Sequence, residues 1–249
     1  MNPSCNSLAL RAMTCAFSVA SILVATAADA PAEDKTAWKT TAAAGVTLTR
    51  GNSETLLGTA NLNSDKKWRQ NELGLGASAA YGEDRGTKNS ESVGAFGQYN
   101  RLVSERFFGY VRADALHDAI ADVEYRVSLS PGAGYYFIKN DRNTLRGEVG
   151  PGYVFEKLGG DNRSYATMRV AERYELKINE RARLWQSFEF MPRVEDFGDY
   201  VLNFEVGVST DITKSFGLRV FAQDTYRSMP ALGRDKNDLK LVAGVEYRF

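Results

Sequence analysis

The stretch LKLVAGVEYRF, residues 239–249, ends the chain and decides the fold. One set of alternate residues is apolar and finishes in two aromatic rings: Leu239, Leu241, Ala243, Val245, Tyr247 and Phe249. The other set is largely polar: Lys240, Val242, Gly244, Glu246 and Arg248. Because side chains of a β-strand point alternately to opposite faces, the stretch predicts a strand with one apolar and one polar face.

The same alternation recurs through most of the chain, in segments separated by turn signals. Strands are expected at residues 38–50, 55–69, 72–81, 91–103, 106–116, 124–138, 143–155, 164–178, 181–194, 200–212, 215–227 and 239–249. An even number of antiparallel strands with alternating polarity is typical of bacterial outer-membrane barrels. The pattern therefore predicts an all-β protein, a transmembrane antiparallel up-and-down β-barrel of about 12 strands.

The connections between these segments alternate in length. Tight turns are expected at residues 70–71, 104–105, 139–142, 179–180 and 213–214, and most intervening connections are longer. Short periplasmic turns and longer outer loops are the usual asymmetry of such barrels. With the amino end in the periplasm, all the tight turns fall on the periplasmic side.

The amino end resembles a secretory signal peptide. Arg11 precedes an apolar and small-residue stretch at residues 15–28, and small residues then offer cleavage after Ala30 or Ala27. The predicted organisation is a signal peptide at 1–30, a periplasmic linker at 31–37 and an outer-membrane β-barrel at 38–249. Both cysteines, Cys5 and Cys15, lie in the signal peptide, so the mature chain would hold no disulfide.

Composition excludes several functional classes. Lysine plus arginine and aspartate plus glutamate both number 31, so net charge gives no attraction to nucleic acid. The sequence has no histidine–cysteine cluster for zinc and no phosphate-binding glycine loop. We therefore expect no cofactor, no metal and no nucleic-acid partner.

The single histidine, His117, is the one candidate for hydrolase chemistry. Nucleophilic catalysis needs a serine within hydrogen-bond reach of a base. Position 119 is alanine, so a serine two residues along the strand is absent, which leaves only a cross-strand partner such as Ser128 or Ser92. We expect no catalytic residues and no enzyme; the alternatives are a hydrolase of lipid or lipopolysaccharide and a soluble periplasmic β-protein that binds a ligand.

On each predicted strand, the set of alternate residues that is mostly polar should line the lumen; we call this set the polar parity and the other set the apolar parity. The expected lining residues are Lys67, Arg69, Arg112, Asp114, Arg126, Arg146, Glu148, Arg169, Arg173, Arg183, Glu189, Glu205 and Arg219. Arginine exceeds carboxylate in this set. One interpretation is a plugged lumen stiffened by arginine–carboxylate pairs; the other is a water-filled pore that favours anions. A barrel of this size lies between filled barrels and wide porins, which favours a plugged or barely open lumen.

Three polar residues fall on the apolar parity, namely Glu172, Gln186 and Asp224. A charge facing lipid costs up to about 2–4 kcal/mol at mid-bilayer and less near the interface. Glu172 fits worst, so we expect either a β-bulge that shifts the register or a partner on a neighbouring strand.

Several short motifs resemble one known family. They are Gly51-Asn52-Ser53-Glu54-Thr55 after a Val-Thr-Leu-Thr strand, GAGYYF at 132–137, GPGY at 150–153 and the terminal Tyr-x-Phe. Together they resemble the YdiY-like family of salt-induced outer-membrane proteins over residues 38–249. The resemblance implies an outer-membrane barrel of a Gram-negative bacterium, linked to osmotic or salt stress, and no functional residues to carry over.

The expected partners follow from this assignment. They are outer-membrane lipid and lipopolysaccharide, the barrel-assembly machinery, and small anions or other solutes. Tyr247 and Phe249 would present the terminal signal to the assembly machinery. The leading function is a narrow channel or a structural barrel of the envelope.

Overall fold

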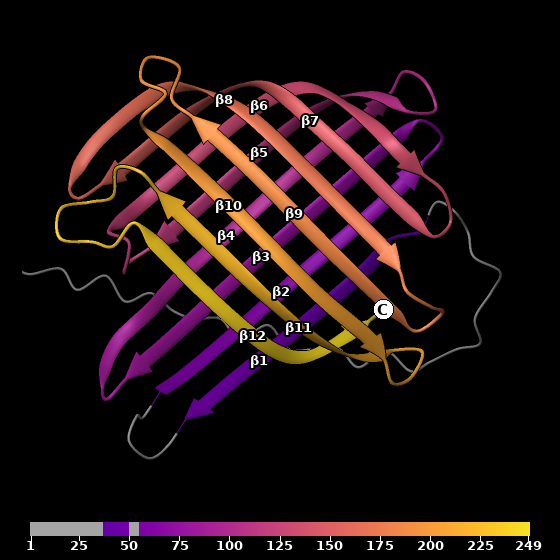
Figure 1. The fold of residues 1–249 in the computed structure, drawn as a ribbon, viewed down its shortest axis with the longest axis horizontal. Helices are drawn as coiled ribbons and strands as arrows, with labels where there is room; N and C mark the ends of the chain where they lie inside the picture. The colour runs from indigo at the N-terminus through magenta and orange to yellow at the C-terminus, as the bar shows by residue number, and fades with distance from the viewer. Residues whose placement is uncertain (1–36, 50–54) are drawn as a thin grey trace, which may run out of the picture. The chain divides into compact units, whose positions relative to one another are not determined.

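The computed structural model describes residues 37–49 and 55–249. Over these residues the chain forms a closed barrel of twelve antiparallel strands, which confirms the predicted fold class (Figure 1). The strands are β1 Lys39–Thr49, β2 Thr55–Trp68, β3 Asn71–Asp84, β4 Thr87–Leu102, β5 Phe107–Asp118, β6 Val123–Lys139, β7 Asn143–Leu158, β8 Asp161–Lys177, β9 Ala182–Pro192, β10 Tyr200–Asp211, β11 Phe216–Arg227 and β12 Asn237–Arg248. No helix in the described part of the chain is long and apolar enough to cross a membrane. The predicted signal peptide and residues 31–36 of the predicted linker lie outside the described residues.

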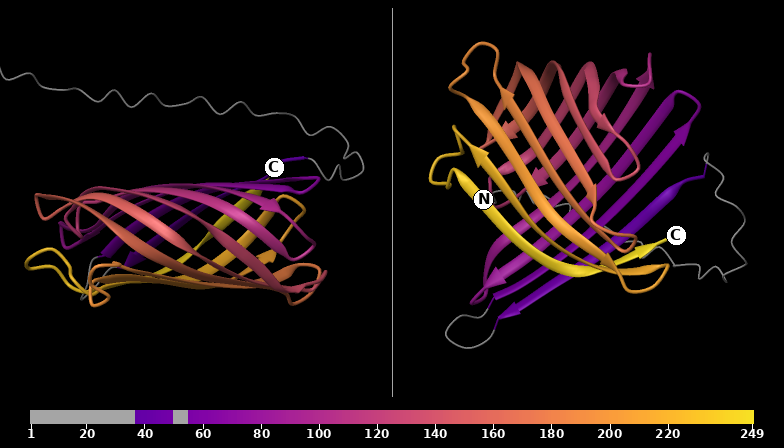
Figure 2. Two further views of the ribbon diagram at one scale, coloured as in Figure 1. Left: turned by 90° about the horizontal axis from the view of Figure 1, so that it is seen from above. Right: turned by 45° about the vertical axis from the view of Figure 1, so that its right-hand side comes forward.

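The first and last strands close the sheet. β1 pairs with β12 from Thr41 opposite Arg248 to Gly45 opposite Gly244. The backbones approach so closely here that a Cβ on Gly45 would lie 2.8 Å from the carbonyl oxygen of Ala243. Closure leaves the sheet without a free edge, and the strands cross the wall obliquely (Figure 2).

The alternation predicted for the last strand is confirmed. Leu241 and Val245 point outward and are 67% and 48% exposed, whereas Val242 and Glu246 point inward and are 4% and 2% exposed. The ring of Tyr247 lies outside the wall, 4.9 Å from Phe216 and 4.8 Å from Phe249, centroid to centroid. The outer wall is therefore apolar with aromatic rings at its end, as a surface in contact with lipid requires.

Two outer connections are much shorter than predicted. β3 and β4 join through Arg85 and Gly86, with φ of 50° and 76°, and β7 and β8 join through Gly159 and Gly160, with φ of 59° and 85°. Positive φ at both central residues defines the type I′ turn, whose twist matches a hairpin. The long loops expected at 82–90 and 159–163 are wrong because these polar residues continue the strand pairing.

Glu172 remains on the outer face, and neither explanation offered for it is correct. It lies opposite Gly147 on β7 and Phe188 on β9 in an unbroken register. Its Oε1 is buried with no hydrogen-bond partner, and no ion pair of Glu172 occurs among the described residues. Gln186 and Asp224 also keep their outward parity, opposite Tyr174 and Phe204 respectively.

Candidate functional site: the barrel interior

Twelve strands bring the predicted lining residues to one enclosed space, with one exception. Arg69 does not lie on a strand: with φ of 50° it forms the two-residue turn between β2 and β3. The prediction for Arg69 is wrong because β2 ends at Trp68, so Lys67 is its last inward residue. Lys67 lies opposite the buried Glu72 of β3, and the remaining predicted lining residues share strand parity with buried residues, so all of them face the interior.

Arg169 on β8 is the hub of the interior. Its side chain is almost fully buried; Nε donates a hydrogen bond to Glu189 on β9 at 2.6 Å and Nη1 donates one to Glu148 on β7 at 2.8 Å. Nη1 also donates to the hydroxyl of Tyr110 on β5 at 3.2 Å. A buried guanidinium that bridges two carboxylates in this way is a strong and directional contact.

The contacts of Glu148 continue across the lumen. Gln98 on β4 donates hydrogen bonds to Glu148 at 2.9 Å and to Asn100 at 3.0 Å. Asn100 in turn donates to Glu72 on β3, which also accepts a 2.7 Å hydrogen bond from the Tyr136 hydroxyl on β6. Because β5 and β6 separate β4 from β7 in the sheet, the Gln98–Glu148 bond spans the interior. We call these residues, with Arg169, Glu189 and Tyr110, the central network.

Aromatic rings fill the space beside the central network. Phe108, Tyr110 and Tyr136 form a buried cluster, and the Phe108 and Tyr136 centroids are 5.2 Å apart. Gly134 makes room for it, since a Cβ there would collide with the ring of Phe108. Sequence reasoning missed this cluster because the predicted lining contained charged residues only. The signal was present, because the consecutive aromatics Phe107-Phe108 must point to opposite faces of the strand.

A second inward apolar cluster lies on the opposite part of the wall. It consists of Trp185 on β9, Phe221 on β11 and Val242 on β12. The guanidinium of Arg219 lies 4.9 Å from the Trp185 ring and 4.5 Å from the Phe221 ring. The indole nitrogen of Trp185 donates a 2.6 Å hydrogen bond to Glu205. This cluster also went unpredicted, and it narrows the lumen from the β9–β12 side.

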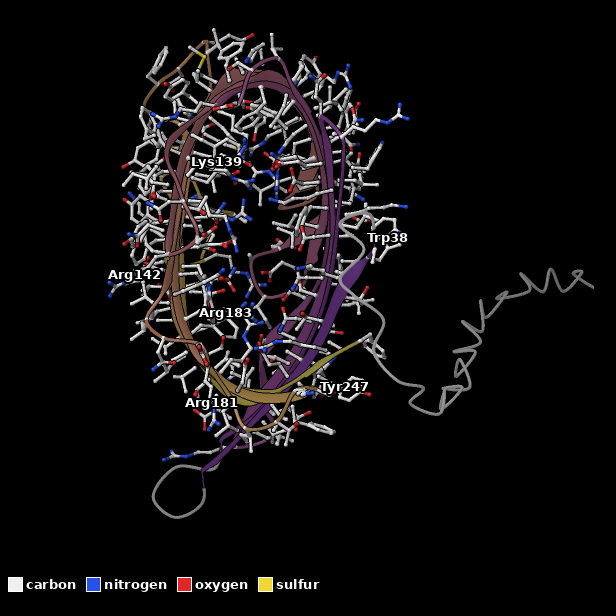
Figure 3. All side chains as sticks on the ribbon, turned by 90° about the vertical axis from the view of Figure 1, so that its right-hand side faces the viewer. Trp38, Lys139, Arg142, Arg181, Arg183 and Tyr247 are labelled. Atoms are coloured by element: carbon white, nitrogen blue, oxygen red, sulfur yellow. The ribbon has the colours of Figure 1, made fainter. Side chains whose placement is uncertain are left out.

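Part of the lumen remains open to solvent. Asp65 on β2, Ser78 on β3 and Gln223 on β11 face inward and are nevertheless exposed. The side chain of Arg183 also points into the interior and is 49% exposed, while it pairs with Glu246 at 2.9 Å (Figure 3). Figure 3 shows Trp38 and Tyr247 outside the wall by contrast. The open space therefore follows the small and polar inner faces of β2 and β3 and reaches β11.

The predicted excess of arginine is largely offset by carboxylates that sequence reasoning did not include. Glu156 lies 3.2 Å from Arg126, and Glu72 lies 3.3 Å from Lys67. Asp118 and Glu156 face inward because β5 and β7 extend past their predicted ends. Arg112 pairs in addition with the predicted Asp114 at 2.6 Å.

His117 is not placed for catalysis. Its Nδ1 lies 2.8 Å from the carbonyl oxygen of Glu124, and the ring faces outward. Ser128 and Ser92 face the interior, so the wall of the barrel separates both hydroxyls from the imidazole. The described residues also contain no group of three or more histidine, cysteine or acidic side chains suited to a metal ion.

Comparison with solved structures also identifies the fold as an outer-membrane β-barrel. The NanC porin matches with a TM-score of 0.54 and 9% identity, over 85% of this chain and 100% of that chain. An outer membrane channel from Pseudomonas putida F1 matches with a TM-score of 0.51 and 9% identity, over 89% and 100%. These similarities show an outer-membrane β-barrel fold of the porin and channel type.

Comparison of sequences identifies the family. The uncharacterized protein YdiY of Escherichia coli (strain K12) is 26% identical over 212 residues, which cover 83% of this chain and 81% of that protein. The family described as protein of unknown function, DUF481, matches residues 42–249. The chain belongs to the DUF481 family.

Proposed function

We propose that the protein is a narrow, non-enzymatic channel in the outer membrane of a Gram-negative bacterium, and that it passes small polar solutes. One observation carries the proposal: Asp65, Ser78 and Gln223 face the lumen yet stay exposed, while the central network seals the opposite side. A structural plug would not need this open sector. A wide pore would not contain hydrogen bonds that cross from β4 to β7.

The channel should discriminate weakly between anions and cations. Its accessible groups include both signs: Lys67 and Arg183 are 69% and 49% exposed, and Asp65 and Glu175 are exposed beside them. Fixed charges of one sign produce ion selectivity in a pore, and mixed charges do not. The anion preference suggested by the arginine count should therefore be weak.

The apolar outer wall supports contact with membrane lipid and lipopolysaccharide. Leu241 and Val245 expose large apolar areas there, and the rings of Phe216, Tyr247 and Phe249 lie together at the end of the wall that we expect to face the periplasm. We propose that Tyr247 and Phe249 also engage the assembly machinery. The link to osmotic or salt stress rests on the family resemblance alone; a rise of the protein in isolated outer membranes after a salt upshift would test it.

Ion conduction in a planar bilayer tests the channel directly. We expect discrete conductance steps from the purified barrel. Ser78→Trp places a bulky ring in the open sector and should cut the single-channel conductance by at least about half, because a narrow pore is governed by its narrowest section. Ala77→Trp is the matched control, because residue 77 points to the outer wall. A flat trace from the unaltered protein would leave only a structural role, and equal effects of the two substitutions would place the solute path elsewhere.

A further inference from the structure

An open hollow lies on the outer face of the wall, beside the turn between β2 and β3. Its lining is Trp68, Arg69, Gln70, Asn71 and Arg101, and its volume is about 650 Å³. Trp68 and Asn71 face outward, because the adjacent pair in the ladder, Lys67 and Glu72, faces the lumen. The hollow, which we call the rim hollow, therefore opens toward the membrane, at the end of the barrel that we expect to face the periplasm.

Hydrogen bonds hold Arg101 beside the rim hollow. Oδ1 of Asn71 accepts a 3.0 Å bond from Nη1 of Arg101 and a 2.7 Å bond from the hydroxyl of Tyr99. The amide nitrogen of Asn71 donates to the backbone carbonyl of Trp68 at 3.3 Å. Because the bond to Asn71 uses only part of the planar guanidinium, other N–H groups of Arg101 can bind a phosphate oxygen.

Two further cations lie around the rim hollow. Arg69 forms part of its lining within the turn. The ammonium group of Lys66 lies 5.4 Å from the ring centroid of Trp38 and 6.0 Å from that of Trp68, so both rings attract it. Trp38 lies outside the wall at this end of the barrel (Figure 3). The corner thus combines aromatic rings with positive charge.

The positive charge of this corner is not offset by acids. Among the described residues, no carboxylate oxygen lies within 4.0 Å of a side-chain nitrogen of Lys66, Arg69 or Arg101. Glu72, the first acid of β3, faces the lumen and pairs there with Lys67 at 3.3 Å. The outer face therefore keeps a net positive charge where it meets the membrane–water interface.

Apolar side chains extend from this corner along the outer wall. Leu73 lies between Lys66 and Tyr99 in the ladder, and Leu75 follows on the same face of β3 and is 43% exposed. Basic residues at an interface attract anionic headgroups, and aromatic rings favour the same depth. A cationic hollow that continues into exposed leucines matches a phospholipid, which joins a phosphate group to acyl chains.

We propose that the rim hollow binds the headgroup of an anionic phospholipid, with Arg69 and Arg101 as ligands of its phosphate and the acyl chains along Leu73 and Leu75. The volume lies within the range of small-molecule sites, about 300–1,000 Å³. The hollow is continuous with the apolar wall, which favours a lipid over a free phosphate ion. The inference goes beyond the proposed channel, because it rests on the expected orientation in the membrane and not on conduction.

Quenching of tryptophan fluorescence by brominated lipids tests the site. The barrel is reconstituted in phosphatidylcholine vesicles that contain an equal mole fraction of either phosphatidylglycerol or phosphatidylcholine brominated on the acyl chains. Trp38 and Trp68 face the lipid and report on the corner, whereas Trp185 faces the lumen. We expect the quenching to give a preference for phosphatidylglycerol of at least about threefold at low salt, and a smaller preference at high salt.

Substitution of the arginines locates the preference. Arg69→Asn removes one charge and keeps the turn, because asparagine tolerates a positive φ; it should lower the preference by about half, and the addition of Arg101→Gln should abolish it. Arg181→Asn is the matched control: it removes the same charge from an exposed turn on the same rim, outside the hollow, and should leave the preference unchanged (Figure 3). Heat-dependent electrophoretic mobility verifies that each variant is folded.

Three results would overturn the site. Equal quenching of the unaltered protein by the two lipids would reduce the corner to an ordinary aromatic belt. A preference that survives both arginine substitutions would place the lipid elsewhere, and an equal loss in Arg181→Asn would mean a general attraction to the charged rim. If the double variant does not fold, Arg69→Asn against Arg181→Asn decides alone. Conduction without a lipid preference overturns only the rim hollow, whereas a preference without conduction overturns only the proposed channel.

Discussion

β7 and β2 both alternate inward and outward residues, but their inward side chains differ in burial. On β7 every inward residue from Glu148 to Leu158 is buried, whereas no inward residue in the described part of β2 is buried. The cause is side-chain size and reach. Long inward side chains of β7 and β8, such as glutamate, arginine and tyrosine, reach and bond to one another between these neighbouring strands. The middle of β2 and β3 presents mostly short inward side chains, such as glycine, serine and asparagine. The alternating pattern thus specifies which residues face the lumen. The size of their side chains determines how much of the lumen they fill.

The largest loss of stability should follow from a substitution of Arg169, the hub of the filled side of the lumen. Arg169→Met leaves the buried carboxylates Glu148 and Glu189 without their shared cation, and removal of one partner from a buried pair costs about 3–5 kcal/mol. Arg173→Met is the control on the same strand: its side chain is 42% exposed and its partner Glu175 54%, so the loss should stay below about 1 kcal/mol. Urea unfolding in lipid vesicles measures both free energies, and equal losses would contradict the division of the lumen into filled and open sides.

A smaller effect should follow from overfilling each side by one methyl group. Gly134→Ala drives a Cβ into the ring of Phe108, where close packing should cost about 1–3 kcal/mol. Gly74→Ala brings its Cβ to 3.2 Å from the carboxylate of Asp65, which can swing into the open lumen, so we expect a change within about 0.5 kcal/mol. The same unfolding measurement compares them. If Gly134→Ala leaves the free energy of unfolding unchanged, the aromatic cluster is packed less tightly than its burial indicates.

The architecture could be predicted from the sequence because lipid contact imposes a period of two on every strand. Leu241 and Val245 on one side and Val242 and Glu246 on the other carry that information within a single segment. Strand ends were less predictable. Polar residues such as Asn162 and Arg163 resemble a loop in sequence, yet they pair with Lys157 and Glu156 in the ladder.

The central network could not be predicted, because its contacts depend on how the sheet closes. Gln98 and Glu148 are 50 residues apart and meet because the wall curves between β4 and β7, which have β5 and β6 between them in the sheet. Sequence parity placed Glu148 and Arg169 on the inward side but could not show which of the inward charges would be neutralised. The pairing of the inward charges determines whether the lumen is plugged or open to solutes, and this pairing is visible only in the folded structure.

The smallest effect should come from a charge on the open side. Asp65→Asn removes an accessible carboxylate from the lumen, so the reversal potential under a salt gradient should move by a few millivolts, about the size expected for one screened charge, toward anion preference. Asp161→Asn is the control, since Asp161 begins β8 at the outer turn and is 77% exposed in its side chain. Stability should not change in either variant, because an exposed charge contributes little to folding. A shift of the same size in both variants would mean that ions do not pass along β2, and the open sector would then be a recess beside the real path.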